Sequence, residues 1–166
     1  MARECDRHRK ASGKVNWTID QEWDADRHLW PLYGIPISIK DNIDMKGLKT
    51  TYGATERLKD EVEKDAPLVK CIKNSGMIPF MKTNIPQLAM CFDTYNPIYG
   101  RALNPWDNHR SAGGSSGGTS AATAARVSPI GIGNDMAGSI RIPSHFCGLC
   151  GLMTSPRRWP KMGNLA

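Results

Sequence analysis

The chain has 166 residues, of which 40% are hydrophobic and 23% are charged, so it is long enough for one globular domain with a buried core. Lysine and arginine number 22 against 16 acidic residues, a modest excess that is scattered along the chain. A nucleic-acid-binding surface would gather such charges on one face with aromatic residues between them, and we expect no nucleic-acid partner because that pattern is absent.

The first 30 residues form a segment of their own. Trp17, Trp23 and Trp30 lie there among many charges, but the apolar residues follow no regular period. We therefore expect residues 1–30 to be helical or irregular and residues 31–166 to form the domain. The beginning of the chain lacks the apolar core of a signal peptide, and no run of about 18 apolar residues could cross a membrane as a helix.

The five cysteines are irregularly spaced, unlike the disulfide framework of a small secreted protein. We expect free thiols and an intracellular protein, in the cytoplasm or peripheral on an internal membrane, where the Asn16-Trp-Thr18 glycosylation sequence would be idle. Cys147-Gly-Leu-Cys150 has the spacing of a redox pair or half a zinc site. It lacks a second pair or a histidine cluster, so we expect no metal.

The first clear element of the domain is a strand over residues 33–40, where apolar and polar residues alternate around a proline. A helix follows, with Asp65 as its N-cap ahead of Pro67 and with Gly76 at its end. Residues 77–81 then indicate a short buried strand. The apolar face of the helix is formed by Leu68, Val69, Cys71 and Ile72.

Residues 84–110 contain three prolines and are expected to be mostly loop. The small residues 120–125 favour a helix that can pack closely on a sheet. Residues 129–133 indicate a buried strand, which leads into a glycine-containing turn over residues 134–143. This succession of helices and strands predicts a layered fold of the α/β class.

The segment Gly113-Gly-Ser-Ser-Gly-Gly118 places two serines in a backbone that can approach another group closely. A flexible linker is the ordinary interpretation, although linkers do not usually continue straight into an alanine-rich helix. A phosphate-binding loop is the other alternative. It would need a lysine after the last glycine, where Thr119 stands, and the glycine spacing of dinucleotide-binding loops is also absent.

A further serine, Ser139, lies in the turn Asp135-Met-Ala-Gly-Ser-Ile-Arg141 beside several backbone N–H groups. Acyl transfer needs this combination, because the hydroxyl attacks a carbonyl while the amides bind the developing oxyanion. The sequence offers no obvious histidine base, since none of the four histidines lies in an evident Ser-His-Asp context. They are His8, His28, His109 and His145.

Lys40 ends the strand predicted over residues 33–40. A lysine at a strand end is usually a charge that reaches the solvent. If it is buried, desolvation lowers its pKa from a reference of about 10.4, and the neutral amine can then act as a general base. The residue alone does not decide between these two interpretations.

Taken together and in this order, the Gly34-Ile-Pro-Ile-Ser-Ile-Lys-Asp-Asn42 strand, the glycine-serine loop and the Ser139 turn resemble the amidase-signature family. That family has a Ser-Ser-Lys catalytic triad. The match runs from about residue 33 to residue 151, and further stretches are similar to the eukaryotic fatty-acid amide hydrolase branch. They are Lys82-Thr-Asn-Ile-Pro-Gln87, Asn96-Pro-Ile-Tyr-Gly100, Asn104-Pro-Trp106 and Phe146-Cys-Gly-Leu-Cys-Gly151.

The resemblance implies roles for the matching residues. Ser139 matches the nucleophile, and Ser115 matches a bridging serine that follows a cis peptide bond to Gly114. Lys40 matches the base, which takes the proton of Ser139 through Ser115. Asp135 and Arg141 match positions that brace the turn without being catalytic, and the backbone N–H groups of residues 136–139 match the oxyanion hole. The substrate-binding positions so implied are Ala89, Ser115, Met136, Ala137, Gly138 and Ser139.

The chain departs from the family pattern at four positions. Asn134 replaces the usual Thr or Ser, Ala137 replaces a Gly, and Met153 replaces a Lys. Ala89 lies where the fatty-acid amide hydrolase branch has a larger methionine that contacts the substrate.

The resemblance implies an α/β hydrolase of linear, lipophilic small-molecule amides that works through an acyl-enzyme without a cofactor. The family domain is several hundred residues long, so we expect this chain to hold part of it, with helices packed on a mixed β-sheet that is incomplete. We expect any membrane association to belong to a longer parent. One alternative is an inactive amidase-like fragment that binds a partner. Another is an amidase-like component of a tRNA-dependent amidotransferase, which the stretches similar to the fatty-acid amide hydrolase branch disfavour. The sequence does not indicate the oligomeric state.

Overall fold

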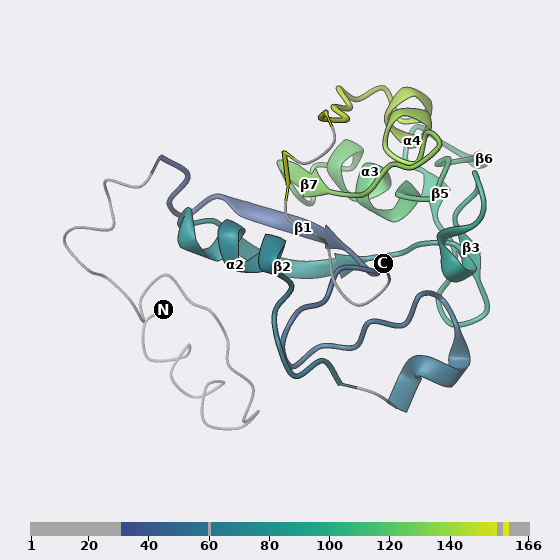
Figure 1. Ribbon diagram of the computed structural model, residues 1–166. Helices are drawn as coiled ribbons and strands as arrows, with labels where there is room; N and C mark the ends of the chain where they lie inside the picture. Colours follow the sequence, from purple (N-terminus) through teal and green to yellow (C-terminus); the bar gives the residue numbers. More distant parts are fainter. Residues whose placement is uncertain (1–30, 60, 156–157, 160–166) are drawn as a thin grey trace, which may run out of the picture.

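A computed structural model describes residues 31–59, 61–155 and 158–159, so the helical or irregular segment expected over residues 1–30 lies outside the described part. The centre of the fold is a three-stranded sheet in the order β2-β1-β7 (Figure 1). The strands are β1 (Pro36–Lys40), β2 (Ile78–Thr83) and β7 (Ile130–Ile132), and both pairings are parallel. The α/β class is confirmed, and the described strands of this sheet all run in one direction.

The two faces of β1 serve different purposes. Ile37 and Ile39 point to one face, where they pack with Leu68 and Val69 of helix α2 (Pro67–Asn74) in the main hydrophobic core. Side chains alternate along a strand, so Ser38 and Lys40 lie on the opposite face. The Lys40 side chain there reaches the glycine-serine loop.

Helix α3 (Gly117–Ala124) covers the Lys40 face of the sheet and contacts all three strands. Its small residues allow a very close approach. The Thr119 hydroxyl lies 2.6 Å from the hydroxyl of Thr83 on β2, and a Cβ added at Gly118 would lie 2.4 Å from the backbone nitrogen of Asn84. The first turn of α3 therefore rests directly on the chain that leaves β2.

A Gly118→Ala variant tests this close packing. Replacing glycine with alanine inside a helix ordinarily stabilises by about 1 kcal/mol. Here the added methyl would collide with backbone atoms that cannot move aside independently, so we expect the free energy of unfolding to fall by about 2 kcal/mol or more. Urea denaturation followed by circular dichroism would measure the change. A neutral or stabilising result would contradict the packing of α3 on Asn84.

The remaining elements are short. They are the 3-10 helices η3 (Thr55–Lys59) and η4 (Gln87–Ala89), the paired strands β3 (Tyr95–Asn96) and β4 (Gly100–Arg101), the paired strands β5 (Leu103–Asn104) and β6 (Asp107–Ser111), and helix α4 (Arg141–Phe146). Among the described helices, none is long and apolar enough to cross a membrane.

Residues 84–110 are mostly loop, as expected, and two small antiparallel ladders interrupt the loop. The turns of these ladders are held by asparagine side chains; Asn96 Oδ1, for example, accepts the N–H groups of Ile98 and Tyr99. Two expectations about these elements need correction. The turn predicted over residues 134–143 already contains the first residues of α4. The small-residue helix begins at Gly117, earlier than residue 120, and extends to Ala124.

The beginning of α2 also differs from the prediction. Ala66 occupies the N-cap position, and no side chain caps the helix. The carboxylate of Asp65 instead accepts the backbone N–H of Lys46 and pairs with Lys73 at 2.6 Å. Cys71 is exposed and does not belong to the buried face, which consists of Leu68, Val69 and Ile72.

Candidate active site

The three segments that the sequence singled out meet at one edge of the sheet. Lys40 ends β1, Ser115 lies in the loop that enters α3, and Ser139 lies in the turn after β7. The carboxyl ends of parallel strands lie at the same edge, so the ends of β1 and β7 are brought together. The glycine-serine loop that holds Ser115 and the turn that holds Ser139, together the two serine loops, are joined directly. The Ser116 N–H donates to the Ser139 carbonyl oxygen at 3.0 Å.

Lys40 is completely buried, with none of its surface exposed. Its Nζ donates to Ser115 Oγ at 2.7 Å and to the side-chain oxygen of Asn134 at 2.5 Å. Burial lowers the pKa of Lys40 from 10.5 to about 7, while the negative charge of Asp135 opposes that shift. The amine is therefore partly neutral near pH 7 and can accept a proton.

Ser115 is also buried and follows a cis peptide bond to Gly114, as the resemblance implies. A Cβ at Gly114 would lie 2.8 Å from the carbonyl oxygen of Cys91. The backbone of residues 91–93 thus lies against the serine loop, and glycine is the residue that permits the approach.

Ser139 is half-buried, and its hydroxyl has no hydrogen-bond partner among the residues that the structure describes. The structure therefore joins Lys40 to Ser115 and brings the Ser139 backbone beside that pair. The further hydrogen bond between the Ser115 and Ser139 hydroxyls, which the implied relay needs, is not formed in the described part of the chain.

The Ser139 turn is held by the carboxylate of Asp135, whose side chain has no exposed surface. Asp135 Oδ1 accepts the Gly138 N–H at 2.6 Å, and Oδ2 accepts the N–H groups of Ile140 and Arg141 at 3.0 and 3.1 Å. The Arg141 guanidinium adds two bonds, at 2.9 and 3.0 Å. The guanidinium and these backbone donors hold the pKa of Asp135 well below its usual range, so the carboxylate stays charged and fixes the turn.

The backbone N–H groups of the turn are not all available to a ligand. The Gly138 N–H, which the resemblance includes in the oxyanion hole, is already used by Asp135. Those of Met136, Ala137 and Ser139 have no acceptor within the described residues and remain open to a developing negative charge. Gly138 has a φ of 116°, a conformation that favours glycine. Ala137 does not have a positive φ, so the methyl group of Ala137 introduces no backbone strain.

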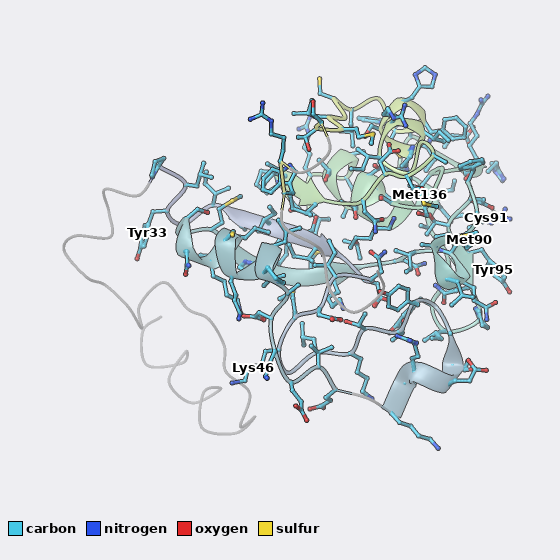
Figure 2. The ribbon with its side chains drawn as sticks, in the orientation of Figure 1. Tyr33, Lys46, Met90, Cys91, Tyr95 and Met136 are labelled. Atoms are coloured by element: carbon cyan, nitrogen blue, oxygen red, sulfur yellow. The ribbon has the colours of Figure 1, made fainter. Side chains whose placement is uncertain are left out.

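The apolar segment of residues 88–90 directly precedes the backbone of residues 91–93 that lies against Gly114. Leu88 and Ala89 both have positive φ, at 56° and 57°, an uncommon conformation for residues with side chains. Met90 and Met136 are largely exposed, at 75% and 86%, and both are labelled in Figure 2. Ala89, expected at a substrate position, is half-buried within this segment.

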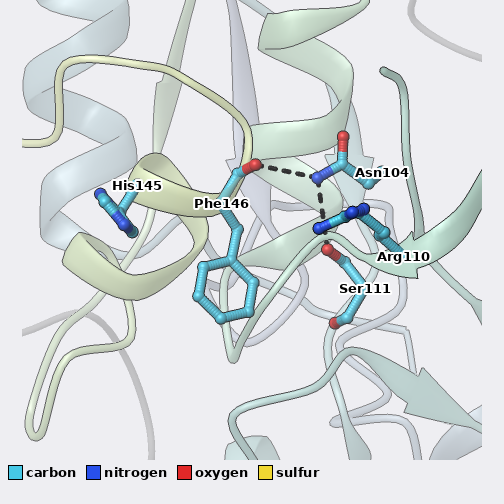
Figure 3. Close-up of a pocket in the computed structure, with 5 residues that line it drawn as sticks. All are labelled: Asn104, Arg110, Ser111, His145 and Phe146. Atoms are coloured by element: carbon cyan, nitrogen blue, oxygen red, sulfur yellow. Dashed lines mark hydrogen bonds between the residues drawn. The ribbon is translucent and has the colours of Figure 1, made fainter. Parts of the chain in front are cut away.

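A hollow between α4 and β6 is lined by other residues than the three catalytic candidates (Figure 3). Asn104 Nδ2 donates across it to the carbonyl oxygen of Phe146 at 2.9 Å, and Arg110 is engaged by Asp107. The lining residues are Asn104, Arg110, Ser111, His145 and Phe146. Within the described residues, no group of histidine, cysteine or acidic side chains could hold a metal ion.

Asn134 departs from the family pattern, but its contact with Lys40 could not be predicted from the sequence. The two residues are 94 positions apart, and nothing local in the sequence signals their contact. The contact arises from the topology of the sheet. Because β7 pairs with β1 in parallel, with Ile132 opposite Ile39, the residues that follow β7 lie beside Lys40 at the end of β1.

The chain is similar to known proteins over most of its length. A family model described as Amidase matches residues 14–166. The chain is 50% identical over 132 residues to vitamin D3 hydroxylase-associated protein of Gallus gallus, with 80% of this chain and 28% of the relative covered. It is 43% identical over 132 residues to fatty-acid amide hydrolase 1 of Sus scrofa, with 80% and 23% covered. The chain thus spans about a quarter of the length of these relatives.

Two solved structures share its fold. The structure of 6-aminohexanoate cyclic dimer hydrolase complexed with substrate has a TM-score of 0.69 and 34% sequence identity, covering 75% of this chain and 27% of that one. A glutamyl-tRNA(Gln) amidotransferase subunit from Thermotoga maritima has a TM-score of 0.67 and 38% identity, covering 69% and 25%.

Proposed function

Since the chain belongs to the Amidase family, we propose that it is part of a serine hydrolase that cleaves amide bonds through an acyl-enzyme. The observation that carries this proposal is the 2.7 Å hydrogen bond between Lys40 Nζ and Ser115 Oγ. It is made by a fully buried amine whose pKa is lowered to about 7, and a base is most effective when its pKa is near the working pH.

In the proposed reaction, Lys40 receives a proton from Ser115 while Ser115 receives one from Ser139. The Ser139 oxygen attacks the amide carbonyl carbon, and the N–H groups of Met136, Ala137 and Ser139 stabilise the oxyanion. As the tetrahedral intermediate collapses, the carbon–nitrogen bond breaks. The proton on Lys40 returns through Ser115 to the leaving nitrogen, and water then hydrolyses the resulting ester.

This relay requires the Ser139 hydroxyl to face Ser115. A serine side chain has three staggered χ1 positions, and rotation among them moves the hydroxyl without moving the backbone. The Ser116–Ser139 backbone bond keeps the two loops adjacent during such a rotation. In the proposed working state, the Ser139 hydroxyl has rotated to face Ser115.

We propose a lipophilic, linear amide as the substrate. Similarity to fatty-acid amide hydrolase 1 supports this class, as do the exposed apolar side chains of Phe92, whose backbone lies against Gly114, and of Met136 in the Ser139 turn. Apolar surface of this kind stabilises a hydrocarbon chain by excluding water from both.

A fluorophosphonate probe tests the proposed chemistry, because it modifies activated serines. We expect labelling of the folded 166-residue chain at Ser139, identified by peptide mass spectrometry, and a rate that rises with pH around a midpoint of about 7 as Lys40 loses its proton. A urea-unfolded sample is the control and should not be labelled. Labelling of a different serine, or none in soluble folded chain, would contradict the proposal and favour an inactive amidase-like fragment.

A second candidate is an amidase-like component of a tRNA-dependent amidotransferase. The observation that favours it is the 38% identity to the amidotransferase protein from Thermotoga maritima. Co-purification with further amidotransferase components and glutamine-dependent activity would support this candidate, whereas hydrolysis of a lipophilic amide by the isolated protein would support the first.

A further inference from the structure

Asn134 lies in the turn between β7 and Ser139, and its side-chain oxygen is 2.5 Å from Lys40 Nζ. The Asn134 carbonyl oxygen is itself within reach of the Ser116 hydroxyl, at 3.4 Å, so the residue is anchored to the serine loop as well. Lys40 consequently has two polar side-chain partners among the described residues, Ser115 and Asn134.

The two partners can play different parts toward a neutral amine. A neutral amine has two N–H donors and one lone pair, and an amide oxygen can only accept. Asn134 Oδ1 must therefore receive an N–H of Lys40. The Ser115 hydroxyl can either accept or donate, so with one N–H held by Asn134 the lone pair can be turned to the Ser115 proton.

We propose that Asn134 is a positioning residue, which holds one N–H of Lys40 so that the amine lone pair faces Ser115. The inference rests on the proposed function, in which Lys40 takes a proton from Ser115. When the amine has accepted that proton, the Asn134 oxygen lies against the new positive charge and stabilises it.

The uncharged character of Asn134 fits this part. Asp135 is the acidic residue that already acts on Lys40, and it is neutralised by Arg141. Nearby, Asp41 and Lys82 face each other at 4.0 Å, and the facing elements α3 and β7 contain no charged residue. A carboxylate at position 134 would keep the lysine protonated, whereas an amide stabilises the ammonium less and leaves the base free at rest.

Two variants of the full chain separate orientation from charge. Asn134→Leu removes the acceptor at similar size, and Asn134→Asp adds a negative charge at the same size. We expect the Lys40 pKa, followed by NMR of 13C-labelled lysine, to fall by about one unit in Asn134→Leu and to rise by about one unit or more in Asn134→Asp. Asn108→Leu and Asn108→Asp, at an exposed position of β6, are matched controls that should leave the Lys40 pKa unchanged.

Fluorophosphonate labelling supplies the second readout. At about pH 9, where Lys40 is neutral in wild type and in Asn134→Leu, we expect the variant to react about tenfold more slowly because only orientation is lost. An unchanged rate there, or a Lys40 pKa that stays constant or moves in the opposite directions, would overturn the proposal. If the wild-type chain does not label but the two pKa shifts occur as expected, the contact between Asn134 and Lys40 stands and the proposed hydrolase activity fails.

Discussion

Replacing Lys40 with methionine is expected to slow fluorophosphonate labelling of Ser139 about a thousandfold at about pH 8, which is typical for the loss of a general base. Methionine has a similar length without the amine, so it can fill the space between β1 and α3 while removing the hydrogen bonds to Ser115 and Asn134. Second-order labelling rates of purified wild type and variant would measure the effect.

Lys82→Met is the matched control for this prediction. Lys82 is another largely buried lysine with a lowered pKa, of about 8, but it bonds to Lys49 and Thr50 instead of a serine of the site. Its loss leaves the Asp41 carboxylate without its cation, so we expect lower stability and a labelling rate within about tenfold of wild type. Equal losses of labelling in both variants would contradict the assigned part of Lys40.

The pH dependence of stability adds a second check on Lys40→Met. The folded-state pKa of Lys40 is about 7 and its unfolded value is 10.5, so the unfolded chain binds the extra proton between these values. The wild-type free energy of unfolding should therefore rise with pH across that window, and the rise should shrink in Lys40→Met. An equally steep rise in the variant would show that the lysine is not held neutral by burial.

The second large effect is expected for Asp135→Asn. Both Asp135 oxygens accept hydrogen bonds from backbone N–H groups and from Arg141, so an amide NH2 in place of either oxygen would face donors. We expect a loss of about 3 kcal/mol in the free energy of unfolding, because a fully covered acceptor of charged bonds is replaced by a donor. Ser139 labelling should fall as well, since the turn that carries it is no longer fixed.

Asp107→Asn is a matched control for the same change. Asp107 also accepts a backbone N–H and an arginine, but in an exposed turn of β6 where water can replace the lost bonds. It should be clearly less destabilising in urea titrations and should leave labelling at the wild-type rate. If the two variants lose the same stability, the covered position of the Asp135 carboxylate is not what holds the Ser139 turn.

The elements that could be predicted from sequence are those governed by local pattern. The alternation around Ile37 and Ile39 and the apolar face of α2 both lie where periodicity placed them. The prediction was wrong at Asp65, because the carboxylate found partners in Lys46 and Lys73 that no capping rule includes. The two ladders within residues 84–110 could not be predicted, because their turns are held by hydrogen bonds from backbone N–H groups to asparagine side chains. The prolines in this stretch indicate a loop.

In the candidate site too, local patterns could be predicted from the sequence and contacts between distant residues could not. Each of its three segments could be identified from its own residues, and their contact follows from strand order. What sequence could not supply is the choice of partners inside the cluster. The bond from Asn134 to Lys40 and the use of the Gly138 N–H by Asp135 both depend on side-chain directions fixed by the assembled loops.

The alternation along β1 has a consequence for how the strand can pair. A shift of one residue would exchange its faces, placing the Lys40 amine in the apolar layer beneath α2 and the isoleucines against the serine loop. A shift of two residues would restore the faces but carry the amine about 6.6 Å along the strand, out of reach of Ser115. The residues on the core face and on the Lys40 face of β1 therefore exclude the neighbouring registers of this strand. An insertion or deletion within β1 would lower both the stability of the fold and the reactivity of the site.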